Sequence, residues 1–324
     1  MKKTLLLILI CISLLNSCST DVDNYADYKD ITIVYGMLDK GVDTTFLKIT
    51  KAYLGPGNAL LFAQNPDSNN YATKLNVTLN GKKNGVNLQV ITLDTLTIHN
   101  KLAGDSIFYF PNQLLYYTTA NIDQEATYTL SVEKDTNIVS ATSKVVQSFG
   151  ITEPSNTFTV ASTAVKQIKW ITGVNGRRYD VVLKFNYREM LPGSSDTLYK
   201  SMSWFLGTQK SVSLTGGEIL DVSYLGADFF SRLDDELEDI FNVKRWAGTV
   251  DIHISCGADE LSSYIDVNAP SNSIVQELPD YTNVENGFGI FSSRLNVVRR
   301  YELNSISETK LVEDHNWGFI RNIK

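Results

Sequence analysis

One stretch decides the fold class of this chain, and it reads Tyr179-Asp180-Val181-Val182-Leu183-Lys184-Phe185-Asn186-Tyr187-Arg188. Aromatic and aliphatic residues occupy alternate positions, and the positions between them are mostly polar or charged. Successive side chains of a β-strand point to opposite faces, so this alternation predicts a strand with one buried and one solvated face. Asn175-Gly176, just before the stretch, predicts a hairpin turn.

Shorter stretches of the same kind lie on both sides of this one, with turn residues between them. Asn80-Gly81 predicts a second hairpin turn, and the many tyrosines, threonines and valines favour strands, so we expect a mainly β chain. The regular spacing of short strands predicts an immunoglobulin-like β-sandwich over residues 30–149. A segment containing Pro154 marks the boundary, and residues 150–324 are expected to form a second β-rich domain.

Three segments show helical periodicity instead. Residues 228–241 carry apolar side chains at spacings of one, three and four, which predicts a helix with Asp228 as its N-cap. Its opposite side is acidic, and we interpret that side as a solvated face rather than a cation site. A second helix is expected near residues 259–266, and a short one over residues 59–64 with Asn58 as its N-cap.

The start of the chain resembles a bacterial lipoprotein signal. A basic beginning precedes an apolar run over residues 4–15, which is too short for a spanning helix of about 20 residues. Leu15-Asn16-Ser17-Cys18 then resembles a lipobox, which implies that residues 1–17 are a signal peptide and that Cys18 carries acyl chains. Residues 18–29 would form a lipidated tether, because two or more acyl chains give stable anchoring. The alternative is an ordinary secretory signal followed by an unrelated cysteine.

Location and partners follow from this anchor. Thr20-Asp21-Val22-Asp23 loosely resembles an acidic surface-display signal, so we expect an outer-membrane protein at the cell surface, with the periplasmic face as the alternative. The formal net charge is −7, and loss of the two lysines in residues 1–17 makes it −9. Such an acidic body is a poor partner for nucleic acid. Only Cys256 remains outside the signal and the lipid site, which excludes an internal disulfide.

No motif for catalysis, a cofactor or a metal stands out. The histidines, His99, His253 and His315, are too dispersed to indicate a metal site. Cys256 falls on the apolar side of a predicted strand, so we expect a buried small hydrophobe and not a nucleophile. We expect no enzyme and no cofactor. A hydrolase that uses a carboxylate pair stays open, because the sequence singles out no such pair.

All four tryptophans, Trp170, Trp204, Trp246 and Trp317, lie beyond residue 150. In a β-sandwich most tryptophan side chains belong to the core, but exposed rings also stack on sugars. Whether residues such as Trp170 and Trp246 are core or ligand contacts stays open, and no ligand-binding residue is assigned.

The most distinctive segment reads Tyr281-Thr282-Asn283-Val284-Glu285-Asn286-Gly287-Phe288-Gly289-Ile290-Phe291-Ser292-Ser293-Arg294. This segment, with the patterns Trp170…Tyr179-x-Val181 and Tyr187-x-Glu189, resembles uncharacterised surface lipoproteins of Bacteroidota. Those proteins carry a domain of unknown function and often accompany TonB-dependent outer-membrane transporters. The resemblance implies a non-catalytic binding or accessory component whose partner is a transporter, a glycan or a peptide. A structural or adhesion protein of the cell envelope is the alternative.

Two features inside this segment concern the backbone. Asn286-Gly287 permits a positive φ, and Gly289 permits a close approach of another chain segment. They fit a turn that seats a late strand, and a ligand-binding loop is the second interpretation.

Overall fold

The computed structural model describes residues 31–52, 58–99, 112–134, 137–269 and 280–321. The predicted signal peptide at 1–17, the tether at 18–29 and Cys18 lie outside these ranges. The described chain is mainly β and is built from packed sheets, so the predicted fold class is confirmed. None of its helices combines the length and the apolar character that a membrane span requires.

The bounds of the elements are as follows. The strands are β1 (Ile31–Asp39), β2 (Thr45–Ala52), β3 (Asn76–Lys83), β4 (Val86–Asn87), β5 (Ile91–Thr92), β6 (Asp94–Ile98), β7 (Gln113–Thr118), β8 (Thr127–Lys134), β9 (Asn137–Lys144), β10 (Gly150–Glu153), β11 (Lys166–Ile171), β12 (Arg178–Met190), β13 (Leu198–Lys210), β14 (Ile219–Tyr224), β15 (Lys244–Gly257), β16 (Val284–Glu285) and β17 (Gly287–Glu302). The helices are α2 (Ala59–Ala63), α3 (Pro66–Asn69), α4 (Gly226–Glu236), α5 (Asp259–Asn268) and α6 (Ser305–Glu313).

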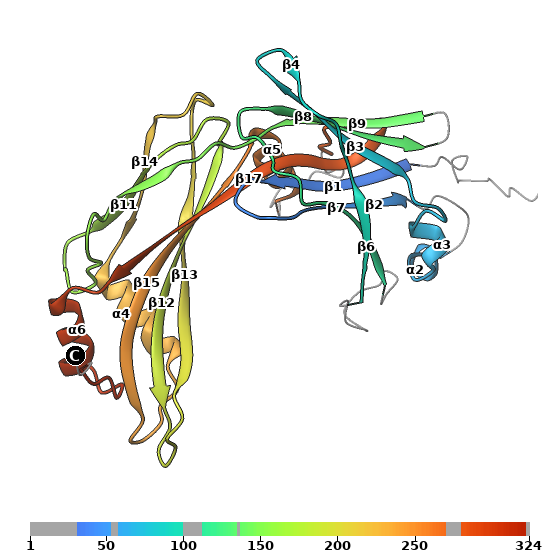
Figure 1. Cartoon of the computed structure of the whole chain (residues 1–324). Coiled ribbons are helices and arrows are strands. Elements are labelled where there is room, and N and C mark those ends of the chain that lie inside the picture. Colours follow the sequence, from blue (N-terminus) through green and yellow to red (C-terminus); the bar gives the residue numbers. More distant parts are fainter. Residues whose placement is uncertain (1–30, 53–57, 100–111, 135–136, 270–279, 322–324) are drawn as a thin grey trace, which may run out of the picture.

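Two lobes share one long sheet (Figure 1). That sheet has the strand order β13-β12-β15-β17-β1-β2-β7-β6, and β17 runs through both lobes. We define the first lobe as β1 to β9 with β16 and the beginning of β17. The second lobe comprises β10 to β15, the end of β17, α4 and α6. Strand β17 is parallel to β1 and antiparallel to β15, so one strand connects the two halves of the sheet.

The first lobe is a sandwich of two sheets. Strands β1, β2, β7 and β6 face the sheet of order β16-β9-β8-β3-β4. Alternate residues of facing strands, such as Val34, Leu47, Val77 and Leu130, are fully or almost fully buried in one cluster. Each such aliphatic side chain contributes about 1.5–3 kcal/mol through removal from water, so the predicted alternation accounts for the packing.

The second lobe is organised around β12, where the predicted strand is confirmed. Its apolar face is buried, with the side chains of Tyr179, Val181, Leu183, Phe185 and Tyr187 in one core cluster. The sheet of order β10-β11-β14 and helices α4 and α6 contribute the opposing side chains of that cluster. The other face of β12, β13, β15 and β17 is half-buried to exposed along most of its length, as the polar positions of the sequence predicted.

Both predicted hairpin turns need correction. Strand β3 continues through Asn80-Gly81, and the chain turns at Asn84-Gly85, where φ is +49° and +82°. Gly81 lies inside the strand, where Tyr128 and Leu88 occupy the space that a larger side chain would need. The glycine at this position therefore serves close packing instead of a turn. Asn175-Gly176 does form a turn, with Asn175 at φ +64°, but β11 pairs with β10 and β14 instead of β12. The turn therefore connects two different sheets.

The helix predictions are partly right. The second helix is confirmed as α5. The short helix is confirmed as α2, and Asn58 caps it by accepting a hydrogen bond from the Leu60 amide. The first helix is shorter than expected: α4 begins at Gly226 without a side-chain cap, so Asp228 is not its N-cap. A Cβ at Gly226 would lie 1.9 Å from the Val160 carbonyl oxygen, so the start of the helix packs closely against the backbone at Val160.

The division at residues 149 and 150 stays a prediction. The first hydrophobic cluster ends at Val145 in sequence and the second begins at Val146, which places the change of core near the expected boundary. Val284 and Phe291, however, belong to the first cluster. The late part of the chain therefore returns to complete the first lobe.

Candidate functional site

The outward side of β13, β12, β15 and β17 carries a hollow of the second lobe. We call this side the open face. Strand register places its residues in rows across the sheet: one row holds Lys184, Asp251 and Arg300, and another holds Ser201 and Asn186. Tyr199 lies opposite Arg188 at the next position along the strands.

A hollow of about 430 Å³ opens on this face. We call it the cationic hollow, because the charged side chains that line it are lysines and arginines. It is lined by Lys184, Asn186, Tyr187, Arg188, Tyr199, Lys200, Ser201, Gly248, Thr249 and Arg300.

A buried ion-pair network lies behind the hollow, on the core side of the sheet, because Lys200 lies opposite Tyr187 in the strand register and faces the same side as Glu189. Glu189 is fully buried and lies 2.7 Å from Lys200 Nζ and 2.7 Å from Arg245 Nε. Burial raises the pKa of Glu189, but the hydrogen bonds from Lys200 and Arg245 outweigh burial, so the pKa lies below its ordinary value. Arg245 is itself buried and donates to the carbonyl oxygens of Trp317 and Glu238. The charge of Lys200 is therefore fixed in position by a rigid, hydrogen-bonded network.

A carboxylate on the open face supports the hollow itself. Arg300 donates from Nε and Nη2 to the two oxygens of Asp251, at 2.7 and 2.9 Å, and Asn186 Nδ2 donates to Asp251 at 3.0 Å. The hydrogen bond from Arg300 lowers the pKa of Asp251, with Asn186 adding to the effect against burial. Asp251 is almost completely covered, whereas the Arg300 side chain is largely exposed. This geometry presents a guanidinium to the hollow and keeps its counter-ion behind it.

Aromatic groups border the hollow. The guanidinium of Arg188 lies 5.5 Å from the Trp246 ring, a cation–π contact. Tyr199 is 83% exposed. The arrangement can hold an anion and offer a flat ring and hydroxyl or amide groups beside it, which is the composition of a binding site rather than of a proton-transfer site.

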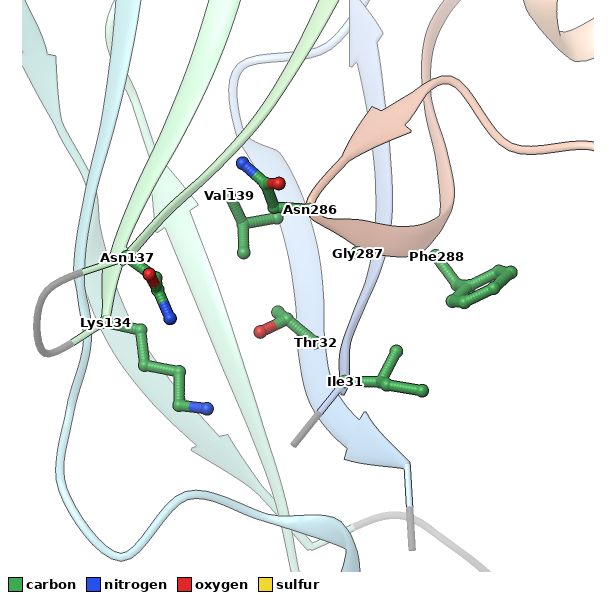
Figure 2. Close-up of a pocket in the computed structure, with 8 residues that line it drawn as sticks. All are labelled: Ile31, Thr32, Lys134, Asn137, Val139, Asn286, Gly287 and Phe288. Atoms are coloured by element: carbon green, nitrogen blue, oxygen red, sulfur yellow. The ribbon is translucent and has the colours of Figure 1, made fainter. Parts of the chain in front are cut away.

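A separate hollow of about 360 Å³ lies in the first lobe, beside the distinctive segment (Figure 2). Figure 2 shows Thr32, Lys134 and Asn137 pointing toward a common space, with Asn286 above them and Phe288 turned away. Thr32 Oγ1 already hydrogen-bonds the Tyr71 hydroxyl at 2.7 Å, and Asn286 donates to the Ile138 carbonyl at 3.0 Å. These contacts stabilise the junction of β1, β9 and β17.

The contacts of the distinctive segment are those of a strand anchor. The Asn283 side chain exchanges two hydrogen bonds with the backbone of Phe291, at 2.6 and 3.0 Å. Gly289 has φ +106°, and a Cβ there would lie 2.0 Å from the Val34 carbonyl oxygen. Asn286 also has a positive φ, as predicted. These features favour the interpretation in which the segment seats β17 against β1.

The tryptophans divide into two groups. Trp170 and Trp204 belong to the core cluster of the second lobe. Trp246 is half-buried beside the cationic hollow, and Trp317 stacks on His315 with ring centroids 3.9 Å apart. Trp317 Nε1 also donates to Asp234, so this ring fastens the segment after α6 to α4.

The remaining candidates lie apart from one another. Cys256 is buried on the apolar face of β15, as predicted, and burial raises its pKa to about 12. His99, next to Asn112, is in the first lobe, whereas His253 lies on the open face with its Nε2 covered and unpartnered. Within the described residues, no group of three or more histidine, cysteine or carboxylate side chains could hold a metal ion.

No residue of the cationic hollow is predicted as a site residue from the sequence. The alternation does place Lys184, Asn186 and Arg188 on the polar side of a strand, but Lys200, Thr249 and Arg300 come from other strands. Their proximity depends on the pairing register between strands, which the sequence pattern of a single strand does not contain.

Comparisons with known proteins add no identification. No family model and no curated protein matches this chain. Among solved structures, it is 10% identical to the C-terminal globular domain of an oligosaccharyltransferase from Pyrococcus abyssi, covering 71% of this chain and 52% of that one with a TM-score of 0.22. It is 8% identical to CBD12 from CALX1.2, covering 84% and 99% with a TM-score of 0.14. The chain thus spans about half (52%) of the first structure, and such low scores carry no argument about fold or function.

Proposed function

We propose that this protein is a lipid-anchored, non-catalytic binding component of the outer membrane that serves as an accessory to a transporter, and that the open face meets its partner. The lipobox-like Leu15-Asn16-Ser17-Cys18 and the resemblance of residues 281–294 support the anchor and the setting. The observation that carries the binding role is the difference between the two faces of β12 and its neighbours. One face is packed into a core, and the other presents the cationic hollow to solvent.

The arrangement of the lobes supports this role. Strand β1 begins at Ile31, at the end of the first lobe that lies away from the second lobe (Figure 1). A chain anchored through Cys18 therefore enters the fold at the first lobe. The second lobe, with the open face, is the part more distant from the point of entry.

Lipidation is tested by mass spectrometry and fractionation. Purified native protein should carry acyl mass on Cys18 and should start at that residue, and Cys18→Ser should leave the membrane fraction. Cys256→Ser is the matched control and should stay in it, because Cys256 is buried in the fold. A native chain that keeps Met1 and lacks acyl mass would contradict the anchor.

The partner is tested by photo-crosslinking in intact cells. A crosslinking residue at Tyr199, on the open face, should capture an outer-membrane protein or its cargo. The same residue at Val86, which is exposed on β4 in the first lobe, is the control and should capture none. Equal capture at both positions would contradict the role of the open face.

One observation favours the structural or adhesion role as a second candidate. Phe205 and Val298 are 57% and 53% exposed on the same face, and apolar exposure suits a protein partner. If the protein captured at Tyr199 is an envelope component unconnected with transport, this second function replaces the first.

A further inference from the structure

We propose that the cationic hollow binds an anionic saccharide, meaning a chain of sugars that carries carboxylate or sulfate groups. This inference rests on the proposed binding role and names the ligand class of the same face.

The charge of the hollow is opposite to that of the protein. The whole chain has a formal charge of −7, yet the side chains of Lys184, Arg188 and Arg300 lie on the open face at the hollow, and no carboxylate is among its lining residues. Glu302 lies close enough to interact electrostatically with Arg300, and it moderates the potential. A local cationic site on an acidic surface selects for small or discrete anions, because long polyanions are repelled by the surroundings.

The cations differ in how far their charge is already compensated. Arg300 has a buried carboxylate partner, Asp251, whereas the charge of Lys200 is directed to Glu189 on the core side of the sheet. Lys184 forms no ion pair or hydrogen bond within the described part of the chain, although it lies opposite Asp251 in the strand register. Asp251 is occupied by Arg300 and Asn186 instead. Lys184 is therefore available to an external anion.

The spacing of the charges favours a ligand with more than one sugar. Lys184 and Arg188 are four residues apart on β12, which corresponds to about 13 Å at 3.3 Å per residue. A ligand with acid groups at two separated positions can contact both cations while their side chains are extended. Between them lies a row with the Ser201 hydroxyl and the Asn186 amide, and Tyr199 stands beside Arg188. A short saccharide with acid groups at both ends and hydroxyl groups in the middle matches this order.

An acidic peptide fits less well. Extended peptides gain affinity by adding a strand to a free sheet edge. The hollow lies on the face of the sheet, and the backbone of β12 is paired on one side with β13 and on the other with β15. At the hollow β12 has no free edge for a peptide to pair with, so recognition there depends on side chains. The Tyr199 ring with the Asn186 amide and the Ser201 hydroxyl suits sugars.

The test is a titration of the purified, full-length mature protein in detergent by calorimetry. The probes are an oligogalacturonate and a heparin-derived oligosaccharide of equal length, with maltohexaose as the uncharged control and hexaglutamate as the peptide control. Binding of either anionic saccharide supports the proposal, and the comparison of the two tells whether carboxylate or sulfate groups supply the charge. Binding should weaken as salt is raised, because exposed charges are screened.

Variants locate the site. Lys184→Gln and Arg188→Gln should each weaken saccharide binding at least about tenfold, which corresponds to the loss of one charge-assisted hydrogen bond. Lys82→Gln is the matched control: Lys82 is exposed on β3 in the first lobe, and its substitution should change nothing. Thermal melting of each variant should match the wild-type protein, since both targets are at the surface.

Several results would overturn the proposal. These are no binding of either anionic saccharide, equal binding of maltohexaose, tighter binding of hexaglutamate, or unchanged binding in both hollow variants. None of these results affects the acyl mass on Cys18 or the membrane fractionation, so failure of this inference is distinguishable from failure of the proposed function.

Discussion

Replacement of Arg245 by methionine is expected to be among the most destabilising substitutions in the second lobe. Arg245 is 2% exposed and pairs with Glu189, which is completely buried. Its Nη1 and Nη2 atoms also donate to the carbonyls of Trp317 and Glu238, at 2.6 and 2.8 Å. Arg245→Met removes these bonds together and leaves the carboxylate of Glu189 with Lys200 alone.

The expected loss is about 3–5 kcal/mol in the free energy of unfolding, because breaking a buried ion pair leaves an uncompensated charge. Guanidinium denaturation followed by tryptophan fluorescence measures it. Arg321→Met is the matched control: Arg321 pairs with Glu313 at the surface, with side chains 66% and 57% exposed, and its loss should cost less than about 1 kcal/mol.

A double variant separates the buried charge from lost packing. Glu189→Gln combined with Arg245→Met removes both charges, so it should cost less than the sum of the two single substitutions. Strict additivity, or a cost of Arg245→Met no larger than that of Arg321→Met, would refute the reasoning.

The same pair predicts an acid dependence. The pKa of Glu189 lies below its ordinary value of 4.5, so its stabilisation is complete above pH 4.5 and is lost as the pH falls through the lowered pKa. In Arg245→Met, burial is opposed only by Lys200, and the acid limb should flatten or reverse. An unchanged acid limb in the variant would assign the effect to other carboxylates.

Three further predictions concern single residues. Burial raises the pKa of Glu260 above 4.5, so the stability of the fold should decrease as the pH rises from 4.5 through the raised pKa. Glu260→Gln should remove that slope in pH-dependent melting curves, and a slope that persists in the variant would contradict this assignment. Gly289→Ala should destabilise the protein by more than about 3 kcal/mol in denaturant unfolding, because backbone strain at positive φ adds to the clash with Val34. Gly85→Ala is the control: Gly85 has φ +82° but open space around it, so the substitution should cost about 1 kcal/mol. Equal costs for the two variants would exclude the clash. The Cys256 thiol should react with Ellman's reagent only as fast as the protein unfolds, because burial raises its pKa to about 12, and rapid labelling of the native protein would show that it is accessible.

The sequence predicted β12 and β15 of the second lobe well because each has one face that is largely buried and one that is largely open. The alternation over residues 179–187 maps directly onto the burial of β12. In β15, likewise, Val250, Ile252, Ile254 and Cys256 are buried, as expected. Alternation predicts a strand and its buried side from local information alone.

Pairing between strands could not be predicted in this way. Asn175-Gly176 has the composition of a hairpin turn, yet the strands on either side belong to different sheets. The cationic hollow was hidden for the same reason, since Lys184 and Arg300 are distant in sequence and meet through the order β12-β15-β17. A local pattern carries no information about which strand becomes the neighbour.

The beginning of β17 shows a different limit. Residues 289–293 are all buried, because this part of the strand is covered on both faces, and the alternation disappears. The polar residues among them, Ser292 and Ser293, are fully buried. Ser293 donates to the Lys144 carbonyl at 2.7 Å and accepts from the Val146 amide at 2.9 Å. Serines that join two lobes have the same local composition as serines in a loop, so sequence patterns cannot separate them.

The transfer of β17 from one lobe to the other connects the anchored end of the fold with the proposed binding face. Arg294 is the last residue of β17 to pair with β1, where it lies opposite Asp39, and the first to pair with β15, opposite Gly257. The Arg294 side chain also forms an ion pair with Asp39 at 3.1 Å. Because a strand cannot rotate about its axis without breaking pairs on both sides, the register fixed at Asp39 also fixes which side of the sheet Arg300 faces, six residues later. The position of a cation in the hollow thus depends on contacts made by the first strand after the predicted tether.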